Sequence, residues 1–182
     1  YLIDTVHLDV SLHDMHTDVT ATLEVYANPA APESVGAPLV LKGVDIELRG
    51  IEVDNVALQP EHYTVFEESL TITGLPARFT LTLHNRIHPE TNTSLEGLYL
   101  SKGMYCTQCE PEGFRKITYY LDRPDVMARF TTRVEAERQR YPVLLSNGNP
   151  VQRGNVGQGR HYVVWEDPFR KPSYLFALVA AR

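Results

Sequence analysis

The chain has 182 residues, of which 43% are hydrophobic and 22% are charged, as in ordinary globular proteins. Its formal net charge of −6 argues against the basic surface with which proteins bind nucleic acid or an anionic membrane. No apolar run approaches the roughly 20 residues of a membrane span, and no secretory signal pattern occurs. We therefore expect no nucleic-acid partner, no membrane span and a cytoplasmic location.

The first half of the chain alternates between apolar and polar side chains, as strands with one buried face do. The alternation is clearest over residues 6–12 and 19–25, which flank a polar turn at 14–17. Further strands are predicted at residues 39–41, 44–53, 63–66, 70–72 and 79–87. Short strands at this spacing predict a mainly β fold, an antiparallel sandwich with at most short helical turns.

Residues 88–111 lack a sustained period and contain Gly97, Gly103 and Pro111, so the sequence predicts a long loop there. Long loops in compact domains are usually either disordered or functional, and the tyrosines of this segment argue against disorder. We therefore look for binding residues in this loop and in the segment that follows it.

Residues 124–140 fit both a helical stripe and the alternation of a strand. The Thr131-Thr132 pair favours the strand, preceded by one helical turn that Asp122 and Pro124 would open. Later strands are predicted at residues 142–145, 151–155, 161–165 and 174–180. Because the last strand ends the chain, we expect residues 1–182 to be one domain of a longer protein.

Two histidine pairs raise the question of a metal site. His84 and His88 have the spacing of H-E-x-x-H, but Asn85 follows the first histidine and the segment reads as a strand. His13 and His16 lie in a predicted turn. We therefore expect no metal-binding site formed by this chain alone.

Cys106 and Cys109 form a C-x-x-C pair, which allows a redox site or half of a zinc knuckle. A knuckle needs a second pair, and a thioredoxin-type site needs a helix N-terminus to lower the thiol pKa. Two cysteines are also too few for a disulfide framework and are consistent with a reducing compartment. The sequence favours structural or incidental cysteines.

Glu110 stands out among the acidic residues because it lies between Cys109 and Pro111 in a stiff segment. A partly desolvated carboxylate there could bind an ammonium group through charge-assisted hydrogen bonds. The composition alone favours a solvated loop acid instead, and Glu96 and Glu112 are equally good candidates. The residues by themselves leave these alternatives open.

Nearly the whole chain resembles the N-terminal domain of the bacterial aminopeptidase N family, zinc metallopeptidases of the gluzincin type. The resemblance rests on long motifs in a fixed order, including CTQCE at residues 106–110 and ITYYLDRPD at residues 117–125. Further matches lie at residues 96–99, 112–115, 129–132, 144–149, 165–169 and 175–180.

The resemblance implies a saddle-like β-sandwich that precedes a thermolysin-like catalytic domain, which binds the zinc through H-E-x-x-H and carries a G-A-M-E-N strand. Neither motif occurs here, so the resemblance implies a fragment without catalytic residues or cofactor, inactive by itself. The family's T-Q-x-E loop corresponds to residues 107–110. Glu110 is therefore expected to bind the α-ammonium of a peptide substrate, and Gln108 to line the pocket for the first side chain.

The resemblance also implies docking between this domain and its own catalytic domain, with Asp122-Arg123-Pro124 near the join. Such a domain should carry an apolar face near residues 106–125. A free-standing β-sandwich module for peptide or carbohydrate would be polar there. A second alternative is a small thiol oxidoreductase that uses the two cysteines.

Overall fold

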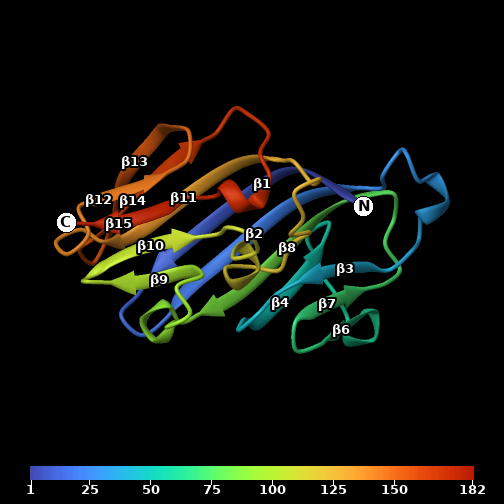
Figure 1. The fold of residues 1–182 in the computed structure, drawn as a ribbon, viewed down its shortest axis with the longest axis horizontal. Coiled ribbons are helices and arrows are strands. Elements are labelled where there is room, and N and C mark those ends of the chain that lie inside the picture. The colour runs from blue at the N-terminus through green and yellow to red at the C-terminus, as the bar shows by residue number, and fades with distance from the viewer.

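The computed structural model describes all residues from 1 to 182, and strands dominate it (Figure 1). No helix is long and apolar enough to cross a membrane. Helical residues are confined to the 3₁₀ turns η1 (Pro32–Ser34), η2 (Pro60–His62), η3 (Pro89–Thr91), η4 (Phe114–Lys116) and η5 (Ser173–Leu175). The predicted mainly β class with short helical turns is confirmed.

The largest element is an eight-stranded sheet with the order β13-β14-β11-β1-β2-β8-β4-β5. Its strands in chain order are β1 (Leu2–Leu12), β2 (Thr17–Tyr26), β4 (Glu47–Val53), β5 (Val56–Ala57), β8 (Arg78–Ile87), β11 (Arg129–Glu137), β13 (Asn149–Gly157) and β14 (Arg160–Glu166). All neighbours pair antiparallel except β1 and β11, which run parallel with Val6 opposite Phe130.

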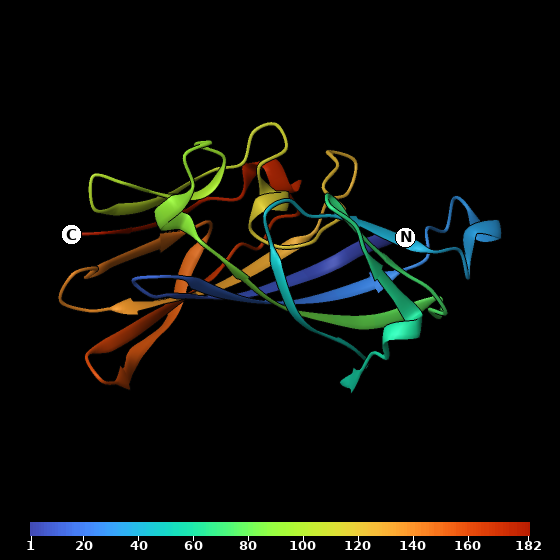
Figure 2. The same ribbon diagram turned by 90° about the horizontal axis from the view of Figure 1, so that it is seen from below.

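Two smaller sheets complete the sandwich. One has the order β12-β15-β10-β9 and the other β3-β7-β6. Their strands are β3 (Leu39–Lys42), β6 (Tyr63–Val65), β7 (Ser69–Ile72), β9 (Gly97–Ser101), β10 (Met104–Gln108), β12 (Val143–Ser146) and β15 (Leu178–Ala181). Figure 2 shows the large sheet curving away from them at both edges, which gives the saddle-like shape. Buried side chains from all three sheets form one cluster of 38 residues.

The alternation predicted for the first two strands is confirmed by the register. Val6 lies opposite Leu23, and Val10 lies opposite Val19. Each of these side chains is no more than 1% exposed, as are Leu8 and Ala21 on the same face, while the residues that alternate with them are exposed or only partly covered. Because successive side chains of a strand point to opposite faces, this register places both apolar faces in the core.

One sequence prediction is wrong, and another is refined. The predicted loop at residues 88–111 contains the β9–β10 hairpin, whose two-residue turn has φ of 51° at Lys102 and 78° at Gly103. Positive φ at both positions is typical of the type I′ turns that join antiparallel strands. The helical turn expected before β11 is a single hydrogen-bonded turn, in which Val126 N donates to Arg123 O over 3.2 Å.

Candidate functional site

Gln108 and Glu110 lie at the end of the β9–β10 hairpin. Gln108 ends β10 opposite Gly97, and Glu110 follows two residues later. The intervening Cys109 side chain points into the core and is only 3% exposed, whereas its two neighbours are exposed. The Gln108 side-chain amide donates a hydrogen bond of 3.3 Å to the carbonyl oxygen of Glu110. The structure therefore brings the two predicted site residues together on one surface.

The segment after Glu110 folds back tightly against the hairpin. Gly113 N donates to Cys109 O over 2.9 Å, and a Cβ atom added to Gly113 would lie 2.3 Å from the carbonyl oxygen of Gln108. Gly97 has a φ of +74°, and a Cβ atom there would lie 2.7 Å from Cβ of Lys116. No other residue fits such close approaches, so these two glycines fix the base of the Glu110 loop.

Phe114 anchors the same loop in the core. Its side chain is fully buried and makes edge-to-face contacts with Tyr120, Phe176 and Phe130 at centroid distances of 4.9, 5.3 and 5.8 Å. Each such aromatic pair contributes roughly 0.5–1.5 kcal/mol beyond the area that it buries. Packing of Phe114 against this aromatic cluster therefore holds the loop that carries Glu110 in place.

Asp122 is a buried carboxylate beneath the loop, with a side chain that is 2% exposed. One of its oxygens accepts hydrogen bonds from Arg115 Nε at 3.0 Å and from Arg115 N at 3.2 Å. The other accepts from the hydroxyl of Ser173. Arg115 also lies 3.5 Å from Glu112. Since a buried carboxylate is costly unless it is paired, this network fixes the geometry of the loop.

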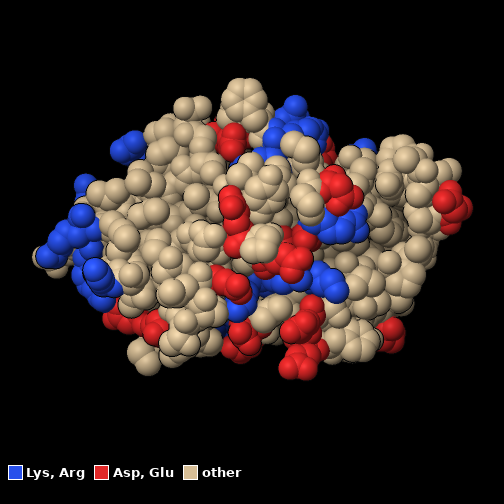
Figure 3. All heavy atoms as spheres, viewed as in Figure 1, with Lys and Arg blue, Asp and Glu red and all other residues tan.

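An open hollow of about 350 Å³ lies beside Glu110. It is lined by Glu110, Pro111, Glu112, Asp122, Arg123, Pro124, Ser173 and Tyr174. Asp122 is already neutralised by Arg115, whereas the carboxylates of Glu110 and Glu112 are exposed. Acidic side chains gather in the middle of this face of the molecule, with basic side chains among them (Figure 3). Arg123 also lines the hollow, and it is paired with Asp125 over 3.1 Å, so the two exposed carboxylates suit the hollow to a small group that carries a positive charge.

The outer face of the four-stranded sheet carries an apolar row. The pairings Cys106↔Tyr99, Cys106↔Val179 and Leu145↔Val179 place one side chain from each strand in this row, which we call the outer row. Leu145 is 42% exposed, and Val143 and Met104 nearby are 41% and 38% exposed. The outer row is the apolar face that the sequence analysis expects beside residues 106–125.

The two cysteines have different environments, and both are free thiols. Burial raises the pKa of the Cys109 thiol to about 12, and the nearby Asp122 carboxylate adds to the shift. Cys109 therefore stays protonated at neutral pH, unlike the nucleophile of a thiol oxidoreductase. Its buried position supports the structural interpretation of this cysteine.

His84 and His88 do not form a zinc site. Nε2 of His84 lies 2.9 Å from Glu52 Oε2, and Nδ1 of His88 lies 3.0 Å from the carbonyl oxygen of Met15. Their rings are held by different partners, so the structure does not bring these two histidines together as ligands. His13 and His16, by contrast, lie close to Asp18, a grouping that the sequence analysis missed.

The profile described as "Peptidase M1 N-terminal domain" matches residues 5–175. The chain belongs to this peptidase M1 N-terminal domain family. It is 49% identical to aminopeptidase N of Escherichia coli and 48% identical to aminopeptidase N of Caulobacter vibrioides, over 99% of the chain. The chain spans 20% of the length of each of these relatives.

Solved structures of M1 peptidases have the same fold. Aminopeptidase A of Legionella pneumophila, solved in complex with aspartic acid, matches with a TM-score of 0.93 and 34% identity, over 100% of this chain and 21% of that one. An M1 zinc metallopeptidase variant of Deinococcus radiodurans bound to a Tyr-Ser-Ala substrate matches with a TM-score of 0.82 over 98% of this chain and 42% of that one. Its 17% identity establishes the shared fold only.

Proposed function

We propose that this M1 N-terminal domain is part of a longer zinc aminopeptidase and binds the free amino terminus of its peptide substrates. The observation that carries the proposal is the exposed carboxylate of Glu110 at the edge of an acidic hollow, on a loop fixed by Gly113, Phe114 and Asp122. The kinship with aminopeptidases N supports it.

The chemistry of the proposed site is the recognition of an ammonium group. An enzyme that removes one residue must hold the amine at a fixed distance from the peptide bond that it cleaves. A rigid carboxylate does this through charge-assisted hydrogen bonds, and it is left unpaired by a substrate whose terminus is blocked. In this proposal Glu110 contributes positioning, which converts binding energy into correct orientation of the scissile bond.

The proposal divides the remaining roles between two domains. Gln108, on the same surface as Glu110, lines the pocket for the first side chain. The catalytic domain docks on the outer row and holds the zinc, whose ligands this chain does not provide. When bound there, zinc polarises the scissile carbonyl and activates water. The chain described here is then a binding domain without peptidase activity of its own.

The substitution Glu110→Gln in the full-length enzyme tests the proposal. It keeps the shape of the side chain but removes its charge, so kcat/KM for unblocked aminoacyl substrates should fall about 100-fold or more, since a charge-assisted hydrogen bond is lost. The matched control is Glu67→Gln, an exposed acid in the β6–β7 turn, which should leave kcat/KM unchanged. Normal kinetics for the Glu110 variant would refute the assignment.

Either Glu110 or Glu112 could be the carboxylate that binds the amine, and a substitution of Glu112 distinguishes the two assignments. Glu112 also faces the hollow but is held by Arg115 at 3.5 Å. We expect Glu112→Gln to change kcat/KM only a few-fold. If the loss of activity followed Glu112 instead of Glu110, the amine-binding carboxylate would have to be reassigned.

A further inference from the structure

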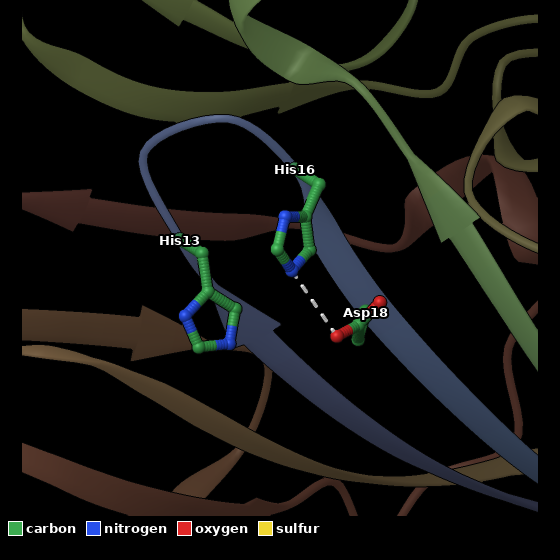
Figure 4. A group of neighbouring side chains, drawn as sticks. All are labelled: His13, His16 and Asp18. Carbon is green, nitrogen blue, oxygen red and sulfur yellow. Dashed lines mark ion pairs between the residues drawn. The ribbon is translucent and has the colours of Figure 1, made fainter.

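We propose that the turn between β1 and β2 binds a divalent transition-metal ion through His13, His16 and Asp18. The turn joins Leu12, the last residue of β1, to Thr17, the first residue of β2. One possible ligand atom from each of the three side chains lies within 4.8 Å of the other two. The two imidazole rings and the carboxylate face a common space (Figure 4).

The spacing of these atoms is close to that of a coordination sphere. Zinc–nitrogen and zinc–oxygen bonds of roughly 2.0–2.1 Å in a tetrahedron place neighbouring ligand atoms about 3.3 Å apart. Nε2 of His16 and Oδ2 of Asp18 are already 3.4 Å apart. The rings of His13 and His16 stack at a centroid distance of 4.9 Å and an interplanar angle of 29°. All three residues are partly exposed, so their side chains have room to rotate. Small rotations would bring the three ligand atoms to the distances of a coordination sphere.

The carboxylate is oriented as metal-binding carboxylates are. Nε of Arg86 donates to Oδ1 of Asp18 over 2.8 Å, and its NH2 group makes a longer bond of 3.3 Å to Oδ2. An ion on Oδ2 would replace only the longer bond, and hydrogen bonds of this kind to a ligand tune metal affinity. Arg160, the other arginine close to the turn, pairs with Glu135 at a distance of 3.5 Å.

Metal binding at His13 would change the hydrogen bonding of its ring. Ser11 Oγ donates its proton to Glu135 over 2.7 Å, so without metal the Nε2 atom of His13, 3.1 Å from Ser11 Oγ, carries the hydrogen and donates it. An ion on Nε2 would move that hydrogen to Nδ1 and replace the bond to Ser11. Two imidazoles and one carboxylate, with water at the open positions, suit Zn²⁺, Co²⁺, Ni²⁺ or Cu²⁺ better than Mg²⁺ or Ca²⁺.

Such an ion would link the end of β1 to the start of β2. Ligands from both sides of a turn bind fully only when the turn is folded, so metal binding stabilises the folded state. At Zn²⁺ concentrations about a hundred times the dissociation constant, the Tm of this chain should rise by roughly 5 °C or more.

The test uses the 182-residue chain after removal of metal with a chelator. Calorimetric titration with Zn²⁺ should show one ion per chain, and Co²⁺ should give visible absorption bands from the same site. In the His13→Asn/His16→Asn variant the affinity should fall at least about tenfold and the Tm rise should vanish. The matched control is His7→Asn, an exposed histidine on β1 away from the turn, which should bind as the parent does.

Several outcomes would overturn the proposal. They are the absence of Zn²⁺ binding below millimolar concentrations, equal affinity in the double variant and the parent, and loss of binding in Cys106→Ser instead. Far-UV circular dichroism without metal establishes that each variant is folded. If the double variant is unstable, His16→Asn alone decides, because the His16 ring stacks on His13 and pairs with Asp18, both within the proposed site.

Discussion

At the scale of single residues, the candidate site depends on which way three consecutive side chains point. Cys109 points into the core, so Gln108 and Glu110 on either side of it must point out. This alternation continues the pattern of β10 past its last paired residue. The buried thiol therefore helps to orient both polar groups, and no redox role is needed to explain it.

Gln108→Ala in the full-length enzyme should alter the choice of the first residue. In our proposal, removing the amide changes the wall of the pocket for the first side chain and leaves the charge of Glu110 in place. We expect kcat/KM ratios between substrates with different first side chains to change roughly threefold to tenfold, with a smaller overall loss than in Glu110→Gln. The exposed Gln59, at the start of η2, provides the control substitution to Ala. An unchanged substrate profile would contradict the role proposed for Gln108.

At the scale of elements, the Glu110 loop is held by backbone packing as much as by side chains. A methyl group on Gly113 would overlap the carbonyl oxygen of Gln108, and backbone atoms there cannot move without disturbing the hairpin. The loop and the hairpin therefore form one rigid unit, and a substitution at the base of the loop should displace Glu110.

Gly113→Ala should lower the free energy of unfolding of this chain by about 1–3 kcal/mol, as overpacking usually does. Thermal unfolding should show a Tm several degrees lower. Gly50→Ala is a suitable control, because a methyl group on Gly50 would make an ordinary contact of 3.4 Å with His84. If both variants melted like the parent, the close packing inferred for the loop would be incorrect.

The same elements explain what could be predicted from the sequence. Strands β1 and β2 have one buried and one polar face, so their period of two is visible. The β9–β10 hairpin hides this period, because Leu98 and Tyr105 face the core while Tyr99 and Cys106 belong to the apolar outer row. The position of Asp122 also depends on Ser173, which is 51 residues away in sequence but adjacent in the fold, and spacing along the chain cannot reveal such a partner.

At the scale of the whole molecule, the outer row makes the four-stranded sheet apolar on both faces. One face packs on the core, and the other exposes Leu145, Val143 and Met104. A free-standing module would have no need of this second face. In our proposal, the outer row is the surface that the catalytic domain covers.

Leu145→Lys tests this explanation. In the isolated chain the exposed side chain should be replaced with little effect, within about 0.5 kcal/mol of unfolding free energy. In the full-length enzyme a lysine would be buried at the interface, so we expect a lower Tm and faster proteolysis between the domains. Val65→Lys, at a comparably exposed strand position, is the control. Equal stability of the full-length Leu145 variant and its parent would exclude docking on the outer row.

The parallel pairing of β1 with β11 has a consequence for how the domain is made. The first strand of the chain lies in the interior of the large sheet, and one of its two neighbours is synthesised only after the hairpin and the Glu110 loop. Contacts between such distant segments close slowly, because the intervening chain must first be confined. On a ribosome, one edge of β1 therefore remains unpaired until β11 has been synthesised, and the large sheet is completed as a late step.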